Sequence, residues 1–417
     1  MITFAERHPN DRPIDSRSLN GVLVACLASA FLVALPALAT DVYGTGSPAH
    51  DVANVQAAVD GGGTVYLHGN FDFTGGGTNA PTPRVITVTR TVQIAGVETK
   101  AGLPTIRGGE TAFFVDAPGM DVTLDGVHFV GQSTSAVTIA AAGNAVVSRC
   151  VIDGVIPSLD PLLNLSVSWG INVSRPPMGT AVIDSLDIER NVVDMLATST
   201  DNTLGIFVAG SVDAASIDRN VVRNATAHAI DVRGFGDGVN ADIERNDVAV
   251  MASERSGISM PPNDRLITGI RVSGTGSYSV LFNDVRIEHP NAAGIRLQTT
   301  TDTIAANNNI VMALPHRTTP GSQSAGVQII RKTMDARICR NTVAGIARTG
   351  VSVLTAADDT VIALTDDTGL ASTFADVEVD VGVTDTLIVG ESGTISDKGT
   401  GTVVTPNPTG HPDYCAS

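Results

Sequence analysis

Aromatic residues and cysteines are scarce in this chain of 417 residues, and each shortage narrows the choice of fold. The chain holds 11 Phe, 4 Tyr and 1 Trp against 42 Gly. Small and β-branched residues dominate, which favours tightly stacked strands over a helical bundle. Beyond position 39 only Cys150, Cys339 and Cys415 remain, an odd and sparse set that excludes a disulfide framework. Cys150 and Cys339 are not expected to bond to each other, and pairing of Cys339 with Cys415 is left open.

Positive charge is also in short supply. Lys and Arg number 26 against 43 Asp and Glu, which gives a formal net charge of −17. Such a charge keeps a secreted protein soluble and argues against nucleic acid as a partner. A local basic stripe can still overrule the net charge, so an anionic substrate is not excluded.

Long hydrophobic runs are confined to the N-terminus. Three arginines between positions 7 and 17 precede the apolar run 21–38, GVLVACLASAFLVALPAL, which ends in the A-x-A signal 37–39. This order is typical of an export signal, so residues 1–39 are predicted to be a cleaved signal peptide. The alternative is a retained membrane anchor. The mature chain is expected to be secreted, periplasmic or in the cell envelope, without stable membrane insertion.

Two short phrases recur along the rest of the chain. The first places two apolar residues two positions apart, directly after a Gly or Ala, which is the alternation of a half-buried strand. These pairs are Val137/Ile139, Ile171/Val173, Ile206/Val208, Ile230/Val232, Ile270/Val272, Ile295/Leu297, Val327/Ile329 and Val351/Val353. The second phrase has an asparagine two positions before an apolar residue. The asparagines are Asn191, Asn220, Asn246, Asn283, Asn308 and Asn341, and Cys150 occupies the same slot.

The spacing of the two phrases predicts a solenoid. Ile270 and Asn283 are 13 residues apart, and Asn220 and Ile230 are 10 residues apart. One turn is therefore about 23 residues, too short for a helix in each repeat, so strands alone must stack in parallel. The expected fold class is all-β, a single parallel β-helix with an asparagine ladder.

Asparagine at a fixed corner has two physical reasons. It tolerates the left-handed backbone that a tight corner needs. Its amide both donates and accepts, so stacked side chains can bond along the column. The arginines that precede these corners are expected to point outward beside acidic neighbours such as Glu189 and Glu244; they are Arg190, Arg219, Arg245 and Arg340.

The two ends of the chain fit the same architecture. Residues 51–60 are predicted to form a short amphipathic helix that the glycines 61–63 stop, followed by a strand at 64–69. Such a helix caps the first turn of an open solenoid. Alternating apolar residues from Val377 to Val404 predict the last turns.

The chain resembles the secreted right-handed parallel β-helix proteins of the pectin-lyase-like superfamily. The resemblance rests on the opening VQAAVDGGGTVYLHG, the repeated asparagine corner and the G-I-x-V strands, over roughly residues 45–405. It implies a right-handed solenoid and, among its enzymes, lyases, hydrolases and epimerases of carbohydrates; other members look non-catalytic. The expected organisation is a signal peptide (1–39), a cap with the first strands (40–84), the β-helix (85–405) and a tail (406–417).

Insertions beyond the 23-residue turn indicate the binding side, because loops of a rigid solenoid cluster on one face. Four of them lie between an asparagine corner and the next I-x-V strand, where they would wall a groove over those strands. The residues expected to face this groove are Thr138, Asn172, Phe207, Asp231, Arg271, Arg296, Gln328 and Ser352, with Arg233 and Gln298 at the next outward position. His228, His289 and His316 lie nearby in sequence.

This row predicts a site for an anionic sugar. Arginine neutralises a carboxylate with a bidentate fork, after which His228 or an arginine could remove a proton, with Asp231 orienting the base or holding calcium. The candidate catalytic residues are Arg271, Arg296, His228 and Asp231, and the candidate substrate-binding residues are Arg233, Gln298, Gln328, Phe207 and His289. Calcium is the one candidate cofactor. The alternative is a ladder of solvated ion pairs. Trp169 could stack a sugar or pack a loop.

The sequence lacks a decisive catalytic motif. His228 lies between Ala227 and Ala229 rather than in Gly-His-Gly, and the Asp-Pro-His phrase of alginate epimerases is absent. Asp153 and Asp194 are either a metal pair or solvated acids, and Asp358 with Asp359 are interpreted as loop acids. Two functions therefore stay open. One is a monomeric polysaccharide lyase, hydrolase or epimerase, and the other is a non-catalytic envelope or surface solenoid that binds glycan or protein.

Overall fold

The computed structural model describes residues 39–74, 84–155, 158–160, 165–174, 181–195, 202–250, 267–289, 292–313, 324–354, 357–363, 370–389 and 394–405. They belong to one compact unit, Ala39–Ser417. The predicted signal peptide lies almost wholly outside the described residues, as do the tail 406–417, His316 and the greater part of the long insertions. No helix among the described residues is long and apolar enough to span a membrane.

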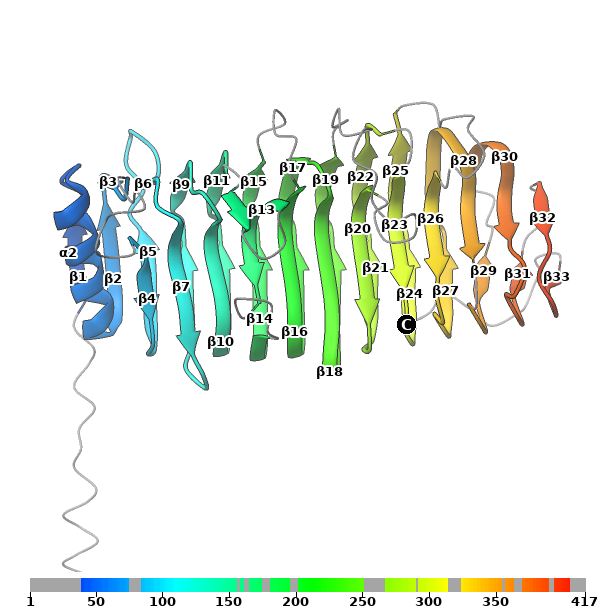
Figure 1. The fold of residues 1–417 in the computed structure, drawn as a ribbon, viewed down its shortest axis with the longest axis horizontal. Coiled ribbons are helices and arrows are strands. Elements are labelled where there is room, and N and C mark those ends of the chain that lie inside the picture. Colours follow the sequence, from blue (N-terminus) through cyan, green and yellow to red (C-terminus); the bar gives the residue numbers. More distant parts are fainter. Residues whose placement is uncertain are drawn as a thin grey trace, which may run out of the picture. The chain divides into compact units, whose positions relative to one another are not determined.

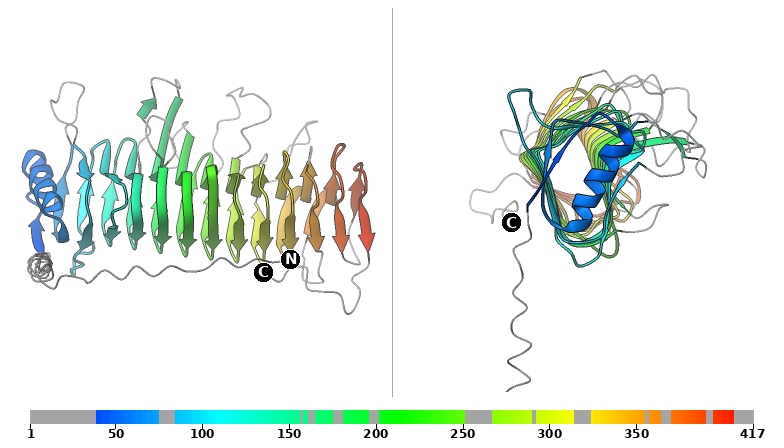
Figure 2. Two further views of the ribbon diagram at one scale, coloured as in Figure 1. Left: turned by 90° about the horizontal axis from the view of Figure 1, so that it is seen from below. Right: turned by 90° about the vertical axis from the view of Figure 1, so that its left-hand side faces the viewer.

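The strands stack turn upon turn in three parallel sheets, which we name sheets A, B and C in the order in which each turn visits them (Figure 1). The view along the stack shows the turns superimposed, with the helix over one end (Figure 2). Each turn thus uses three strands where the sequence required at least two. The asparagine corner lies between sheets B and C.

Sheet A carries the I-x-V strands. It consists of β4 (Ile86–Val88), β7 (Thr111–Ala117), β10 (Ser135–Ser148), β13 (Leu165–Val173), β16 (Asn202–Asp218), β18 (His228–Glu244), β20 (Ile267–Gly274), β23 (Ala292–Gln298), β26 (Ala325–Ile330), β28 (Thr342–Leu354), β30 (Leu370–Val379) and β32 (Ile395–Asp397). A short strand, β12 (Ser158–Asp160), pairs antiparallel with β13.

Sheet B follows in each turn, and the long strands β10, β16 and β18 continue into it. Its own strands are β1 (Thr40–Tyr43), β2 (Gly63–His68), β5 (Val92–Gly96), β8 (Val122–Asp125), β14 (Ala181–Glu189), β21 (Tyr278–Leu281), β24 (Thr303–Ala306), β27 (Ala336–Cys339), β29 (Val361–Ala363), β31 (Leu387–Val389) and β33 (Val403–Thr405).

Sheet C comes after the asparagine corner, and the start of β28 also belongs to it. Its strands are β3 (Asn70–Asp72), β6 (Thr105–Arg107), β9 (His128–Val130), β11 (Val151–Asp153), β15 (Val192–Asp194), β17 (Val221–Ala225), β19 (Asp247–Val250), β22 (Asp284–Ile287) and β25 (Asn309–Met312).

The predicted capping helix is present as α2 (Pro48–Gly61). It begins before the predicted start because Pro48 suits the first helical turn, and it ends before Gly62, which takes a φ of 72°. Val55 and Val59 are buried against the first turn. Asp51 is fully buried, and its carboxylate accepts backbone N–H bonds from Thr45, Gly46 and Asp72, which fixes the entry to the helix.

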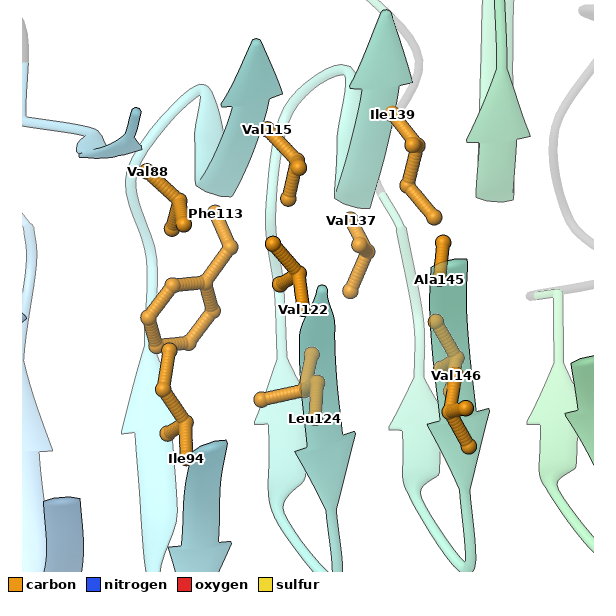
Figure 3. A pocket seen from close by; sticks show the side chains of 11 residues that line it. Val88, Ile94, Phe113, Val115, Val122, Leu124, Val137, Ile139, Ala145 and Val146 are labelled. Atoms are coloured by element: carbon orange, nitrogen blue, oxygen red, sulfur yellow. The ribbon is translucent and has the colours of Figure 1, made fainter. Parts of the chain in front are cut away.

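The interior is a continuous stack of Val, Ile, Leu and Phe side chains that runs through the described turns. One small cavity, of about 10 Å³, lies among core side chains between sheets A and B (Figure 3). Figure 3 shows Phe113, Val137 and Leu124 on its wall. Its lining is apolar and it has room for about one water molecule at most, so it stays dry and is no ligand site.

The small residue before each I-x-V strand is explained by packing. A Cβ on Gly205 would lie 2.2 Å from the Cγ1 of Val222 and 2.6 Å from the carbonyl oxygen of Ala229. The equivalent atom on Gly269 would lie 2.4 Å from the Cγ1 of Val285. The backbone packs closely against sheet C and the next turn at these two positions, so an added Cβ would clash and glycine is required there.

The asparagine ladder is confirmed from Asn191 to Asn341. Each Oδ1 accepts the backbone N–H and the Nδ2–H of the asparagine one turn earlier, as Asn246 does from Asn220 at 2.9 and 3.1 Å. Each Nδ2 also donates to a backbone carbonyl, that of Ile217 in the case of Asn246. Cys150 joins the column through its N–H, which donates to Asn191.

One part of the asparagine interpretation is wrong. The left-handed residue at each corner is the one before the asparagine, for example Arg219 with a φ of 53° and Phe282 with a φ of 55°. The asparagine side chain must enter the turn, so the positive φ that reverses the chain falls on the preceding, outward residue. As expected, arginines that precede the corners pair with acids, Arg190 with Glu189 and Arg245 with Glu244.

The cysteines behave differently from one another. Cys150 is free and fully buried, and burial raises the pKa of its thiol to about 12. Cys339 is disulfide-bonded, and its partner lies outside the described residues. The two do not pair with each other, as the sequence predicted. A disulfide is typical of proteins that fold in an oxidising compartment.

Candidate functional site

The predicted outward row lies in register on neighbouring strands of sheet A. Phe207 on β16 pairs with Asp231 on β18, which pairs with Arg271 on β20. Arg271 in turn pairs with Arg296 on β23, and Arg296 with Gln328 on β26. Parallel strands lie about 4.8 Å apart, so these side chains form one continuous column on the outer face. The I-x-V residues on either side of each one point into the core.

From Asp231 to Gln328 the column is closed to solvent, which differs from the open groove that the sequence predicted. Asp231 is 0% exposed, Arg296 1% and Arg271 8%. A ladder of solvated ion pairs is therefore wrong for these three residues. Charged groups are very rarely found at this depth unless they are paired, because removing them from water is costly.

Five charged or titratable residues, which we name the charge cluster, lie together on sheet A: His228, Asp231, Arg233, Arg271 and Arg296. Asp231 is the centre of this cluster. Its Oδ2 accepts hydrogen bonds from Nε of Arg233 at 3.0 Å and from Nη2 at 2.7 Å. Its Oδ1 lies 3.3 Å from Nε of Arg271. Burial raises the pKa of this carboxyl, but the charges of Arg271 and Arg233 together outweigh burial and hold the pKa at about 2. Asp231 therefore stays ionised at any physiological pH.

His228 lies on the same strand and touches the cluster through Arg271. The Nη1 of Arg271 lies 3.2 Å from Nε2 of His228. Arginine can only donate, so Nε2 accepts and the neutral ring carries its proton on Nδ1. Burial, reinforced by the charge of Arg271, lowers the pKa of His228 to about 3. A neutral ring whose Nε2 lone pair is already engaged is poorly placed to remove a proton.

An aromatic stack adjoins the cluster. The rings of Trp169 and Phe207 lie 6.3 Å apart at an angle of 29°, and Cζ of Arg233 lies 5.0 Å from the centre of the Phe207 ring. Phe207 thus contacts an indole and a guanidinium, while the same guanidinium binds Asp231. The sequence singled out these residues but not the stack, because Trp169 and Phe207 do not face each other in the strand register.

The β-helix is similar in structure to solved proteins of low sequence identity. The A-module of the Azotobacter vinelandii mannuronan C-5 epimerase AlgE4 superposes with a TM-score of 0.51 at 15% identity, covering 88% of this chain and 98% of that one. DFA-IIIase from Arthrobacter chlorophenolicus A6, without its lid, gives 0.53 at 13% identity, covering 91% and 98%. This chain is a right-handed parallel β-helix of the pectin-lyase-like fold.

The Streptococcus pneumoniae surface protein and adhesin PfbA gives a TM-score of 0.46 at 10% identity over 88% of this chain and 100% of that one. No protein-family model and no curated protein sequence matches the chain. At these identities the likeness of the β-helix to its neighbours concerns the fold alone.

The other predicted site residues take different places on the β-helix. Gln328 is fully buried in the column. Arg296 acts at a distance, because its positive charge helps to lower the pKa of His228. Gln298 ends β23 and is half-buried. His289 lies two residues beyond the end of β22, off the strands of sheet A.

Two groups of acidic residues outside the cluster bear on a metal site. Asp153 and Asp194 are register neighbours, as predicted, but Asp153 contacts His128 at 2.8 Å and Asp194 accepts from Asn224. Among the described residues, one set of three carboxylates lies within reach of a common ion. It comprises Asp358, Asp359 and Asp385. The charge of Asp358 raises the pKa of Asp359, as repulsion between exposed loop acids does.

Tyr278 is a buried residue that the sequence did not single out. Its hydroxyl accepts the N–H of Gly234 at 3.2 Å and lies 3.0 Å from the carbonyl of Ser273, to which it donates. Burial raises the pKa of this phenol to about 12. Gly234 directly follows Arg233, so Tyr278 fixes β18 at the point where its pairing in sheet A ends. Partners that are all backbone groups leave no signal in a sequence.

We expect Tyr278→Phe to lower the free energy of unfolding by about 1–3 kcal/mol, because the Gly234 N–H loses its buried acceptor. Chemical denaturation of the purified protein measures this. Tyr66→Phe, at a tyrosine that is 37% exposed, is the matched control and should change stability little. Equal stability of Tyr278→Phe and the parent would contradict the assignment.

Proposed function

We propose that this β-helix is a secreted protein that binds an acidic polysaccharide along the outer face of sheet A. The observation that carries the proposal is the cluster itself. The guanidinium groups of Arg233 and Arg271 contact the single carboxylate of Asp231, and Arg296 lies one strand beyond Arg271, in a chain whose net charge is −17. Arginine is the side chain best suited to carboxylate and sulfate groups, because its fork matches their geometry.

The direction of the column suits a linear polymer. Phe207, Asp231, Arg271 and Arg296 follow one another along the stacking axis, one strand apart. A polysaccharide that lies along this axis runs parallel to the column and contacts its accessible side chains, Phe207 and the neighbouring Arg233. One structural neighbour is by its name a mannuronan C-5 epimerase, and another, DFA-IIIase, has been solved in complex with GF2 and with DFA-III. A disulfide-bonded Cys339 agrees with secretion.

Cleavage of the polysaccharide is the second candidate. The convergence of Asp231, Arg271 and His228 within contact distance favours chemistry over a splayed row of ion pairs. Proton abstraction, however, needs a group that is free to accept a proton near neutral pH. Asp231 is held ionised by two arginines, and Nε2 of His228 accepts from Arg271. The geometry of the described residues therefore supports binding more strongly than β-elimination or hydrolysis.

Binding is tested by isothermal titration calorimetry with polygalacturonate, alginate and a neutral glucan, with and without calcium. We expect Arg233→Gln to weaken binding of an acidic chain at least about tenfold, since a charge-assisted hydrogen bond contributes about 1.5–3 kcal/mol. Arg286→Gln removes an exposed, ion-paired arginine from sheet C and should leave the affinity unchanged. A folded protein that binds neither acidic chain, or binds the neutral glucan equally well, would overturn the proposal.

The same samples report on cleavage. New ultraviolet absorbance indicates an unsaturated product and hence a lyase, and new reducing ends without that absorbance indicate hydrolysis. Binding without either signal supports a non-catalytic solenoid. Calcium takes part in binding only if its removal by a chelator changes the affinity for the acidic polysaccharide.

A further inference from the structure

Exposure is unevenly spread over the charge cluster. Asp231, Arg271 and Arg296 are almost completely buried. The side chain of Arg233 is 32% exposed, and Phe207 and Trp169 are half-buried. Among the described side chains, the accessible part of the cluster is therefore the part beside β16, where Trp169 and Phe207 meet Arg233. A ligand that approaches from solvent contacts this end first.

Arg233 is held in a single orientation. Its Nε and Nη2 both donate to Asp231, and its Cζ lies over the Phe207 ring. Its third nitrogen, Nη1, forms no hydrogen bond with any described residue. An arginine fixed on two sides loses little side-chain freedom on binding, so its remaining N–H groups can bind an anion at low entropic cost.

The two rings next to Arg233 provide an apolar surface. Trp169 is the only tryptophan of the chain, and its ring and that of Phe207 lie nearly parallel. Half-buried aromatic side chains with one accessible surface are typical of ligand sites, where they supply contact area with few degrees of freedom. The apolar faces of a pyranose ring can pack on such a surface while its substituents stay in reach of the polar neighbours.

We propose that Trp169, Phe207 and Arg233 form a subsite for one uronate residue of the polysaccharide. The sugar ring packs against the aromatic pair, and its carboxylate accepts hydrogen bonds from Nη1 of Arg233. Asp231 and Arg271 lie behind this subsite and position Arg233. The inference rests on the proposed function, because it assigns one contact point of the same ligand.

A purely structural stack would have different properties. Trp169 and Phe207 would then only support Arg233, and a bound saccharide would not alter the surroundings of the indole. The single tryptophan makes the two cases separable, because all tryptophan fluorescence of the protein arises at position 169.

The experiment is a fluorescence titration with tetragalacturonate and tetramannuronate, with maltotetraose as the neutral probe, beside calorimetry on the same samples. We expect a saturable change in tryptophan emission with an acidic tetrasaccharide and none with maltotetraose. Phe207→Leu should weaken that affinity about fivefold. Phe282→Leu replaces an exposed phenylalanine away from the cluster, at an asparagine corner, and should have no effect. Circular dichroism checks that each variant is folded.

The outcomes separate the two proposals. Calorimetric binding of an acidic tetrasaccharide without a change in emission, and with equal affinity in Phe207→Leu, overturns the subsite and leaves the proposed function intact. Absence of calorimetric binding for both acidic tetrasaccharides and for the acidic polymers overturns both. A change in emission that maltotetraose produces equally well overturns the role of Arg233 as the anion contact.

Discussion

Replacing Asn246 by alanine is expected to lower the free energy of unfolding by about 4 kcal/mol. The side-chain oxygen of Asn246 accepts two hydrogen bonds from Asn220, and its Nδ2 donates to the oxygen of Asn283 and to the carbonyl of Ile217. Four buried hydrogen bonds at about 1 kcal/mol each give this estimate. The substitution also leaves polar groups of both neighbouring turns buried without partners, so the value is a lower bound for a rigid stack.

Urea denaturation followed by circular dichroism measures the effect. Asn144→Ala is the matched control, because Asn144 is exposed and bonds only to Asp121 among the described residues. It should cost less than about 0.5 kcal/mol. If the two substitutions cost the same, the ladder does not stabilise the fold in the way its geometry indicates. A solenoid is stabilised turn by turn, so Asn246→Ala is also expected to broaden the transition.

Acidification should destabilise the protein through His228 before it affects Asp231. The folded pKa of His228, about 3, lies below the ordinary value of 6.5, so the unfolded chain binds a proton that the folded chain does not. Stability therefore falls as the pH drops from about 6.5 toward 3, by up to about 1.4 kcal/mol per pH unit. The Asp231 carboxyl has a folded pKa of about 2 against 3.8, so its contribution is lost only below about pH 3.8.

The variant His228→Gln isolates this effect. Glutamine keeps an acceptor for Arg271 but cannot take up a proton, so the variant should lose less stability than the parent between pH 7 and pH 4. The expected difference is about 3 kcal/mol, measured as unfolding free energies at fixed pH steps. Parallel curves for the two proteins would contradict a buried, neutral His228. His128→Gln is the matched control, because His128 is partly exposed and bonds to Asp153, and it should not reproduce this gain at low pH.

The periodic features of the fold could be predicted because each is dictated locally and repeated. The strand phrase and the asparagine corner recur from turn to turn at similar spacing, 13 residues from Ile270 to Asn283, so one sequence contains many copies of the same evidence. The error at the corner has a physical cause. Asparagine adopts a left-handed backbone more readily than arginine does. The side chain of Asn246, however, must point into the turn to bond to Asn220, so the preceding Arg245 adopts the positive φ.

The site was only partly predictable. Register alone placed Asp231 beside Arg271, and the structure joins them. Burial of the column could not be read from the strands, because alternation tells which way a side chain points and not what lies over it. The contact of Trp169 with Phe207 depends on side-chain directions across two strands, and that of Tyr278 with Gly234 on the bend of β18. Neither contact is marked by a periodic pattern in the sequence.

The asparagine column has a consequence for how such a chain can change its length. Within the column each asparagine bonds to the asparagine of the turn before or after it, and Asn283 and Asn308 are 25 residues apart. Duplication or loss of one complete coil would restore every bond, whereas an indel of a few residues within the coil would interrupt the column. Evolution of this molecule is therefore expected to proceed in whole coils or in the loops, and a gain of one coil would lengthen the stack of sheet A by about 4.8 Å.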